Sequence, residues 1–429
     1  MATVTLVPPR ARGELTLPAI HVVLDAGHPR PGARHLLRDV ERVVIGRGAE
    51  PPRRAGTTLY LELPDRHLSG EHCAIERGLG GWTIRDLGSK NGLSVEGERT
   101  AHRVLDDGDW IELGETLLRF RVVQVERFAP DDAIAEPGGS LVPGVEVALR
   151  RLADAAASNV PVLLLGPSGV GKHDAARLVH ARSGRRGRFI VVRCAGLGDQ
   201  LASATLFGDS DGPGAFAAAH GGTLLLDDVA DLPLATQGAL LRVLQEREVV
   251  PVGSTRAQAI DVRVVAATLR DLEREVEAAR FRVDLYAQLA GLRVALPPLR
   301  ERLEDLGTLV ASALARHSPD RLLGLQPSAA WALCRHRWPR NLRELDHAIA
   351  AAVAVTHDDR LGGELVEQIG TSLAPSAAEL VAARRDELVA LLREHHGNLA
   401  AVARALATSR AQVHRLLRRF ELDPDAYRR

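Results

Sequence analysis

The fold of the middle of this chain is decided by Gly166-Pro167-Ser168-Gly169-Val170-Gly171-Lys172-His173, which follows an apolar run from Val160 to Leu165. The run predicts a buried strand, and the residues after the loop have a helical pattern through His180. Glycines let the backbone N–H groups of such a loop close around phosphates at a helix N-terminus, and the lysine neutralises the charge of the β and γ phosphates. The stretch therefore predicts a nucleotide-binding α/β domain.

The residues expected to bind ATP or ADP are Gly166, Ser168, Gly169, Val170, Gly171, Lys172 and His173. His173 stands where phosphate loops usually have a Ser or Thr hydroxyl. A glycine-rich loop alone is a weak motif, and a chance loop is the alternative. The context favours a nucleotide site, because the loop lies between a strand and a helix and because Lys172 is one of only two lysines in the chain.

Paired carboxylates follow a second apolar strand, Thr223–Leu226. Asp227 and Asp228 are suited to hold Mg²⁺ and to polarise water, so both are candidate catalytic residues and Asp227 is the candidate metal ligand. Strands and a helix alternate around this strand, at Phe189–Val192, Leu234–Glu248 and Val262–Ala266. The alternation predicts a parallel sheet.

Short β-prone runs separated by Gly, Asp and Pro turns fill the chain before residue 126. They are Ile20–Leu24, Arg42–Ile45, Thr58–Leu63, Cys73–Glu76, Trp82–Asp86, Trp110–Leu113 and Leu117–Val123. Closely spaced short strands indicate an all-β sandwich. The residues that follow, 129–144, are rich in Pro, Gly and Asp and too polar to pack, so we expect a linker there.

Three motifs in the sandwich have residues that suit phosphate binding. They are Gly46-Arg47, Ser69-Gly70-Glu71-His72 and Asp86-Leu87-Gly88-Ser89-Lys90-Asn91-Gly92. Loops at one end of a sandwich can present a guanidinium, a hydroxyl and an amide to one phosphate and to the backbone beside it. The alternative is a sandwich whose Arg and Asn side chains only occupy turns.

The spacing of these motifs resembles the forkhead-associated (FHA) domain, which binds phosphothreonine, over about residues 20–125. The resemblance implies phosphate contacts from Arg47, Ser69 and Lys90 and a peptide-backbone contact from Asn91. It gives Gly46 and His72 structural roles. Gly70 departs from the family, which often has a polar or basic side chain at that position.

Many ordered motifs between residues 206 and 345 resemble the AAA+ domain of bacterial enhancer-binding proteins, the sigma-54-dependent activators. They are Leu206-Phe207-Gly208, Gly221-Gly222-Thr223, Leu240–Glu248, Ala266-Ala267-Thr268, Arg280-Phe281-Arg282, Leu296-Pro297-Pro298-Leu299-Arg300-Glu301-Arg302 and Trp338-Pro339-Arg340-Asn341-Leu342-Arg343-Glu344-Leu345. The resemblance implies an arginine-finger region at Arg282 and a sensor II arginine at Arg343 in a helical lid. Both are therefore candidate catalytic residues.

Four departures from that family surround the position of the γ-phosphate. Asp228 replaces a Glu and is shorter by one methylene, about 1.5 Å, and a displacement of that order can cost about 100-fold in rate. Arg193 and Leu269 replace two Asn residues, and Gln288 replaces a second arginine finger. Losing a finger alone can cost about 10³- to 10⁵-fold in turnover. The substitutions favour a nucleotide binder with weak hydrolysis.

A loop with the sequence G-A-F-T-G-A touches the sigma factor in these activators, and Gly214-Ala215-Phe216 invites that identification. The register opposes it, because Phe216 lies five residues before Gly221, where the family has the phenylalanine of a Pro-Gly-x-Phe segment. Only residues 209–212 remain between Gly208 and Pro213. Four residues span at most about 14 Å when extended, so we expect a short turn and doubt a sigma-54 contact. The rival interpretation is that a neighbouring loop substitutes.

The carboxy-terminal residues have the pattern of a helix-turn-helix that resembles the Fis-type domain of the same family. A helical run at Ala377–His396 precedes Asn398–Leu406, a short turn and Ser409–Phe420, and no acidic residue interrupts Gly397–Phe420. The expected DNA-binding residues are Arg410, Gln412, His414, Arg415, Arg418 and Arg419. Ala407 replaces the turn glycine of the family. The alternative is an ordinary helical hairpin whose arginines reflect codon bias.

Composition and charge limit the partners and the cellular compartment that we expect for this chain. The 55 basic and 55 acidic residues cancel, so any charged partner is bound locally. The three cysteines lack metal-ligand spacing and favour a reducing cytoplasm, and no apolar run is long enough for a membrane helix. We expect a soluble cytoplasmic protein whose partners are duplex DNA and a phosphothreonine-containing protein.

The sequence predicts a multidomain chain of an all-β FHA sandwich, an α/β AAA+ domain with a helical lid, and an all-α helix-turn-helix. The expected bounds are 1–128, a linker at 129–144, 145–298 for the core, 299–370 for the lid, and 377–429. We expect a homo-oligomer that binds DNA as a dimer, and the sequence does not decide whether the chain also assembles into a ring. Two functions remain: a DNA-bound, phosphopeptide-responsive regulator that binds ATP or ADP without sigma-54 remodelling, and an ATP-hydrolysing activator of RNA polymerase holoenzyme.

Overall fold

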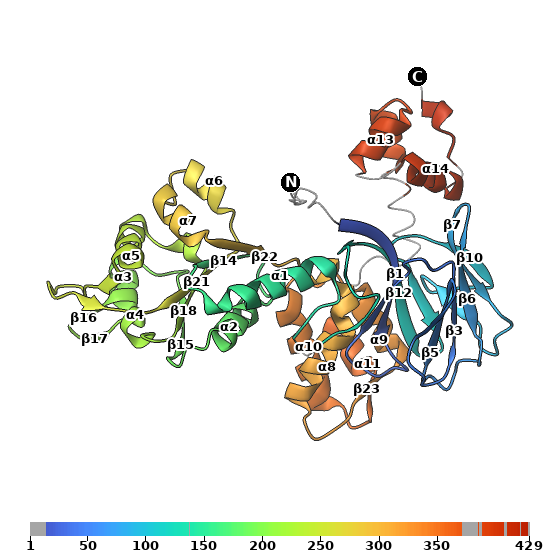
Figure 1. Ribbon diagram of the computed structural model, residues 1–429, viewed down its shortest axis with the longest axis horizontal. Coiled ribbons are helices and arrows are strands. Elements are labelled where there is room, and N and C mark those ends of the chain that lie inside the picture. Colours follow the sequence, from blue (N-terminus) through green and yellow to red (C-terminus); the bar gives the residue numbers. More distant parts are fainter. Residues whose placement is uncertain are drawn as a thin grey trace. The chain divides into compact units, whose positions relative to one another are not determined.

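The computed structural model describes residues 14–136, 138–370, 385, 388–406, 410–420 and 422–427. These residues fall into two compact units, one holding the residues up to Cys334 with Trp338–Ile369, the other holding Arg335–Arg337 with the residues from Gly370 on. The first unit contains a β-sandwich, an α/β core and a helical lid (Figure 1). Among the described residues, no helix is both long and apolar enough to cross a bilayer.

Two antiparallel-rich sheets form the sandwich. One sheet has the order β13-β2-β1-β12-β11-β8-β9 and the other has the order β10-β7-β6-β3-β5-β4. The strands are β1 (Glu14–Leu24), β2 (Ala33–Leu36), β3 (Arg42–Arg47), β4 (Arg53–Ala55), β5 (Thr58–Leu63), β6 (Cys73–Gly78), β7 (Gly81–Asp86), β8 (Leu93–Val95), β9 (Glu98–Thr100), β10 (His102–Leu105), β11 (Trp110–Leu113), β12 (Thr116–Glu126) and β13 (Asp132–Ile134). Each of the seven runs expected from the sequence lies in a strand, so the expected sandwich is confirmed.

The segment 129–144 corrects one expectation, because it does not behave as an unpacked linker. Its strand β13 pairs with β2 at the edge of the sandwich. Ser140 and Leu141 are buried, and Asp305 of the lid accepts hydrogen bonds from the Ser140 hydroxyl at 2.6 Å and from the Leu141 backbone N–H at 2.9 Å. Polar residues pack here because a distant carboxylate satisfies them.

A five-stranded parallel sheet, β15-β18-β21-β14-β22, forms the centre of the α/β core, as the alternation predicts. Its strands are β14 (Val162–Leu165), β15 (Phe189–Arg193), β18 (Thr223–Asp227), β21 (Arg263–Thr268) and β22 (Leu292–Ala295). The helices are α1 (Pro143–Asp154), α2 (Lys172–Arg182), α3 (Asp199–Phe207), α4 (Ala215–Ala218), α5 (Leu234–Glu246), α6 (Leu272–Glu277) and α7 (Val283–Leu289). Both faces of this sheet are buried against apolar side chains. Its strands are therefore near-continuous apolar runs and do not alternate with polar residues.

Two small hairpins extend from the core. One is β16 (Gly208–Asp209) with β17 (Gly212–Pro213), and the other is β19 (Glu248–Val249) with β20 (Gln258–Ala259). Phe216, just after the first hairpin, is 1% exposed and stacks on Phe207, with ring centroids 6.1 Å apart. The aromatic side chain therefore belongs to the core and not to an exposed loop.

The lid is helical, as expected after residue 298. It consists of α8 (Leu306–His317), α9 (Pro327–Arg335), α10 (Asn341–Val355) and α11 (Gly363–Ile369), with a two-stranded pair of β23 (Gly324–Leu325) and β24 (Arg360–Leu361). Its apolar core also includes Val23, Leu24, Trp110 and Leu117 of the sandwich. The sandwich and the lid therefore share one hydrophobic cluster.

Charged and glycine residues fix this interface between sandwich and lid. Glu304, 1% exposed, pairs with Arg119 at 3.2 Å and with Arg121. Burial alone would raise the pKa of Glu304, but the two arginines outweigh it and hold that pKa below its ordinary value. Gly307 lies so close to the sandwich that a Cβ there would be 2.0 Å from the carbonyl oxygen of Val23. Only glycine fits this contact.

The second unit contains α13 (Leu399–Ala405) and α14 (Arg410–Arg419). The Asn398 side chain accepts hydrogen bonds from the backbone N–H groups of Ala400 and Ala401, so it caps the N-terminus of α13. Among the described residues of this unit, the buried apolar cluster contains Leu388, Leu392, Val402, Ala403, Val413, Leu416 and Leu417. Val413, Leu416 and Leu417 of α14 thus face the apolar core of this unit.

Candidate functional site

The carboxyl ends of neighbouring parallel strands bring the expected nucleotide residues together. The loop 166–171 follows β14, Asp227 ends β18, and Thr268 ends β21. A cavity of about 1130 Å³ lies at this edge. Ligands of open α/β sheets bind in this position. The lining includes Ser168, Gly169, Val170, Gly171, Lys172, His173, Asp227, Asp228 and Arg343, and Gly166 is not part of it.

The lid contacts the phosphate loop closely at one of its glycines. Gly169 has a φ of +77°, and a Cβ on it would lie 2.2 Å from the carbonyl oxygen of Arg340. Asn341 donates a hydrogen bond to the Ser168 carbonyl at 2.9 Å, and Arg343 donates to the Ser168 hydroxyl at 3.4 Å. The lid therefore contacts the loop that would bind phosphate, and Arg343 is at the cavity as the resemblance implies.

Lys172 is buried at the start of α2, where its ammonium group donates to the carbonyl oxygens of Gly166 at 2.9 Å and Pro167 at 3.0 Å. Burial lowers its pKa, and the carboxylates of Asp227 and Asp228 act in the opposite direction. The ammonium thus rests on the backbone of its own loop, within reach of the two acids.

His173 and Asp227 are in direct contact, from α2 and the end of β18. The Nε2 atom of His173 lies 2.7 Å from Oδ2 of Asp227. Asp228 follows with a φ of +55°, and its pKa is raised by burial and then by the charge of Asp227. The two acids differ in their surroundings, because only Asp227 has the imidazole partner.

These residues fit a divalent cation only in part. The carboxylates of Asp227 and Asp228 are ligands that Mg²⁺ prefers. The hydroxyl that would complete the usual set is replaced by an imidazole, which Mg²⁺ accepts poorly. Among the described residues, no group of three or more His, Cys, Asp or Glu side chains could hold a metal ion unaided. Any cation here would therefore depend on oxygen atoms of the nucleotide.

Of the four substituted residues, Asp228, Arg193 and Leu269 line this cavity, whereas Gln288 does not. Leu269 is 55% exposed. Arg282 does not line the cavity; its guanidinium forms a salt bridge with Asp284 at 2.7 Å. A role of Arg282 as an arginine finger toward a neighbouring copy stays a prediction.

Arg302 is a residue of the site that sequence reasoning missed. It is buried, and its guanidinium donates to the carbonyl oxygen of Val170 at 2.6 Å. Asn341 is a second such residue, because it contacts the loop and also accepts a hydrogen bond from the Leu299 backbone at 2.8 Å. Both lie within motifs that the sequence displays, but only the structure assigns them contacts.

The expected phosphopeptide residues come together at one end of the sandwich. The Arg47 backbone N–H donates to the Ser69 carbonyl at 2.8 Å, and the Lys90 backbone N–H donates to the Ser69 hydroxyl at 3.1 Å. The side chains of Arg47 and Lys90 are exposed. Asn91 donates to the His67 carbonyl at 2.7 Å, which fixes its side-chain amide. Two cations and a hydroxyl are thus grouped in neighbouring loops.

His72 and Gly46 have the structural roles that the resemblance implies. His72 is completely buried, accepts a hydrogen bond from the Ser69 N–H at 3.2 Å, and contacts the Gly92 carbonyl with its other nitrogen at 3.0 Å. A Cβ on Gly46 would lie 1.7 Å from the Gly70 carbonyl oxygen. Gly70 itself faces open space, so nothing in the fold requires glycine there.

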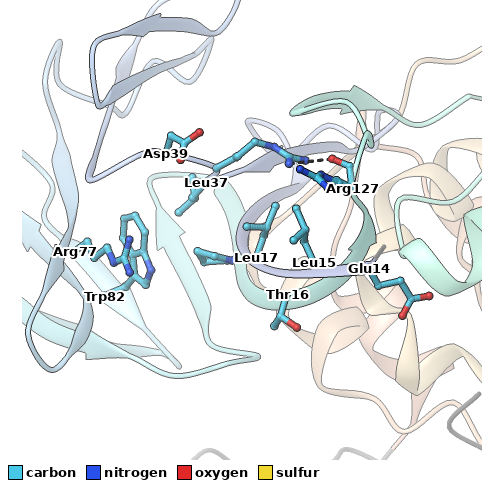
Figure 2. Close-up of a pocket in the computed structure, with 11 residues that line it drawn as sticks. Glu14, Leu15, Thr16, Leu17, Leu37, Asp39, Arg77, Trp82 and Arg127 are labelled. Atoms are coloured by element: carbon cyan, nitrogen blue, oxygen red, sulfur yellow. Dashed lines mark hydrogen bonds between the residues drawn. The ribbon is translucent and has the colours of Figure 1, made fainter. Parts of the chain in front are cut away.

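A second cavity of about 620 Å³ lies at the other end of the sandwich, beside the turn between β6 and β7. Figure 2 shows Leu15 and Leu17 of β1 with Arg77, Trp82 and Arg127 among the residues that line this cavity. The phosphopeptide loops adjoin the opposite ends of β6 and β7. This cavity is therefore separate from the candidate phosphopeptide site.

The candidate DNA-binding residues lie on α14. Arg410 and His414 are exposed. The side chains of Gln412, Arg415, Arg418 and Arg419 lie outside the described part of the chain, as does the turn residue Ala407. DNA binding by this helix stays a prediction.

Comparison with known proteins agrees with this architecture. Three family models match: FHA domain at residues 43–114, Sigma-54 interaction domain at 142–295, and AAA+ ATPase lid domain at 300–379. The response regulator protein FleR of Pseudomonas aeruginosa is 45% identical over 227 residues, which are 50% of this chain and 48% of FleR. The regulatory protein LuxO of Vibrio cholerae is 35% identical over 348 residues, 71% of this chain and 65% of LuxO.

Among solved structures, NtrX of Brucella abortus in complex with ADP is 30% identical, with a TM-score of 0.52 over 65% of this chain and 68% of NtrX. The chain spans about half to two thirds of the length of the curated relatives named here. The three family models together describe an FHA domain, a Sigma-54 interaction domain and an AAA+ lid, in the order in which the sandwich, the core and the lid follow along the chain. The chain belongs to the family of sigma-54-dependent transcriptional regulators and carries an FHA domain.

Proposed function

We propose that this chain is a DNA-binding regulator that senses a phosphothreonine-containing protein through its FHA domain and binds ATP or ADP through its AAA+ domain. It hydrolyses ATP weakly and does not open sigma-54 promoter complexes. The observation that supports the lack of sigma-54 remodelling is the short hairpin of β16 and β17, where Ser210 and Asp211 alone join the strands.

The reach of this hairpin argues against a grip on a sigma factor. Each arm has two residues, so the tip extends about 7 Å from Gly208. The Asp211 backbone N–H donates to the Asp209 carboxylate at 2.8 Å, which closes the turn tightly. Phe216 is buried against Phe207 and is not available at the surface. These contacts support the register that the sequence predicts.

Weak hydrolysis is supported by the cavity itself. Asp228 is the residue in the position of the family's glutamate, and one methylene less moves its carboxylate back by about 1.5 Å. Burial and the neighbouring Asp227 raise its pKa, so ionised Asp228 is less favoured than in water. Arg193 and Leu269 supply no amide to orient water or phosphate. Binding is retained because the loop, Lys172 and Arg343 remain.

Nucleotide binding is further supported by the likeness to NtrX, which was solved with ADP. Phosphothreonine binding is supported by the grouping of Arg47, Ser69 and Lys90, since two cations and a hydroxyl give charge-assisted hydrogen bonds to a phosphate. Duplex DNA is the proposed partner of α14, bound by a dimer. Its affinity falls as salt rises, because arginines that contact phosphates release counterions.

The second candidate is an ATP-hydrolysing sigma-54 activator, and the match of residues 142–295 to the Sigma-54 interaction domain favours it. In this case the neighbouring hairpin of β19 and β20, next to the exposed Val250 and Val252, would replace the missing loop. It predicts that RNA polymerase holoenzyme is a partner.

Transcription in vitro with purified sigma-54 holoenzyme separates the two candidates. The full chain is added with ATP to a promoter that carries its DNA site, and a sigma-54 activator that has the long loop serves as the positive control. We expect no open complexes with this chain. Nucleotide-dependent open complexes would show that the second candidate is correct.

A further inference from the structure

The pair of His173 and Asp227 suggests which cation accompanies the nucleotide. The Nε2 and Oδ2 atoms are 2.7 Å apart, the two side chains are 39% and 17% exposed, and both residues line the cavity. Lys172 does not compete for this carboxylate, because its ammonium group is bonded to two loop carbonyls. The imidazole is therefore the direct partner of Asp227.

The separation of these two atoms suits shared coordination. Metal–nitrogen and metal–oxygen bonds to His and Asp are about 2.0–2.2 Å long, so two such ligands at a right angle lie about 3 Å apart. The observed 2.7 Å is close to this value. A small movement of either side chain therefore lets one ion replace the hydrogen bond between them. The nucleotide's phosphate oxygens would supply further ligands, as is usual for nucleotide-bound cations.

The donor types decide which ion fits. Mg²⁺ prefers oxygen ligands and gives up its water reluctantly, whereas imidazole suits first-row transition ions, whose affinity for a mixed nitrogen and oxygen site rises from Mn²⁺ to Cu²⁺. A phosphate loop with a Ser or Thr hydroxyl offers Mg²⁺ an oxygen, and His173 removes it. The same replacement adds a nitrogen donor beside a carboxylate.

We propose that the divalent cation bound with the nucleotide is held by His173 and Asp227, and that this site prefers a transition ion such as Co²⁺ or Mn²⁺ to Mg²⁺. The proposal rests on the proposed nucleotide binding. It concerns binding and not hydrolysis, so it holds whether or not ATP is turned over.

Calorimetric titration of the full chain with ADP tests this directly, in EDTA, Mg²⁺, Mn²⁺ and Co²⁺. We expect ADP to bind on the order of tenfold more tightly with Co²⁺ than with Mg²⁺. His173→Ser should lose that preference and favour Mg²⁺, since it restores the hydroxyl. His173→Gln keeps the bulk without an imidazole and should also lose the preference for Co²⁺.

Adventitious metal binding needs its own control, because the chain has 16 histidines. His102→Ser removes an exposed histidine of the sandwich and should leave the cation preference unchanged. In the Mn²⁺–ADP complex, electron spin echo modulation from a directly bound imidazole nitrogen should be present in the wild type and absent in His173→Ser.

The outcomes are distinguishable. Three results would overturn this proposal and leave nucleotide binding intact. They are tighter ADP binding with Mg²⁺ than with Co²⁺ in the wild type, ADP binding in EDTA as tight as that with Co²⁺, and an unchanged preference for Co²⁺ over Mg²⁺ in His173→Ser. Failure of ADP to bind under every condition would overturn the proposed function and this proposal with it.

Discussion

Gly307→Ala tests the contact between the sandwich and the lid. The added Cβ would lie 2.0 Å from the Val23 carbonyl oxygen and 2.9 Å from that of Arg30. A carbon–oxygen contact needs about 3.3 Å, so the α8 backbone and β1 must separate by about 1.3 Å. Both obstacles are backbone atoms, which no side-chain rotation can relieve.

Two opposing free energies decide the size of the effect. Overpacking of this kind costs about 1–3 kcal/mol, whereas Gly→Ala in a helix gains up to about 1 kcal/mol. The strain is larger, so we expect a net loss of about 1–2 kcal/mol. For a cooperative unit of about 200 residues this lowers the melting midpoint by roughly 2–8 °C.

The tryptophans make this measurement selective. All four lie in the sandwich or the lid, at Trp82, Trp110, Trp331 and Trp338. Fluorescence-monitored melting of the full chain therefore reports on these two parts. The matched control is Gly363→Ala in the first turn of α11, where a Cβ meets no atom within 4 Å. Equal midpoints for the two variants would refute the close contact.

Three further predictions concern the binding surfaces and pH. Arg47→Ala should abolish binding of a phosphothreonine peptide in calorimetry, and equal binding of phosphorylated and unphosphorylated peptides to the wild type would contradict the FHA site. Arg418→Ala should weaken binding to all DNA sequences in gel shifts while Gln412→Ala changes the preferred sequence, and a shift insensitive to both would remove the DNA-binding assignment. Burial lowers the pKa of His21 to about 3 from its ordinary 6.5, so the unfolded chain takes up a proton that the folded chain does not, and stability falls by about 1.4 kcal/mol per pH unit below pH 6.5. His21→Leu removes this dependence of stability on pH. The difference in melting midpoint between His21→Leu and the wild type should therefore change steadily below pH 6.5 and stay constant above it. A difference that stays constant down to pH 5 would contradict the reasoning.

Local patterns made much of this fold predictable. The strand β14 is an apolar run followed by Gly166, β18 is an apolar run that ends in Asp227, and the loop glycines need no distant partner to be recognised. The same holds for Asn398, whose cap is satisfied within three residues. Patterns of this kind depend on neighbours in the sequence, which the sequence displays.

Contacts between distant residues were not predictable. The strand β13 has only three residues, too few to show a strand pattern, and it is held by β2, about 100 residues earlier. In the sequence, Arg302 cannot be told from an ordinary surface arginine, because its partner Val170 lies 132 residues away. The pairing of His173 with Asp227 spans 54 residues, so the sequence showed only that a hydroxyl was missing and not what the imidazole contacts.

The most direct test of the proposed function is to measure ADP or ATP binding and ATP turnover on one preparation of the full chain, beside Lys172→Ala and Asp228→Glu. We predict binding that Lys172→Ala abolishes, turnover far below that of a sigma-54 activator measured in parallel, and an increase in turnover on Asp228→Glu, which restores the missing methylene. Robust hydrolysis by the wild type that is lost in Asp228→Ala would contradict the account.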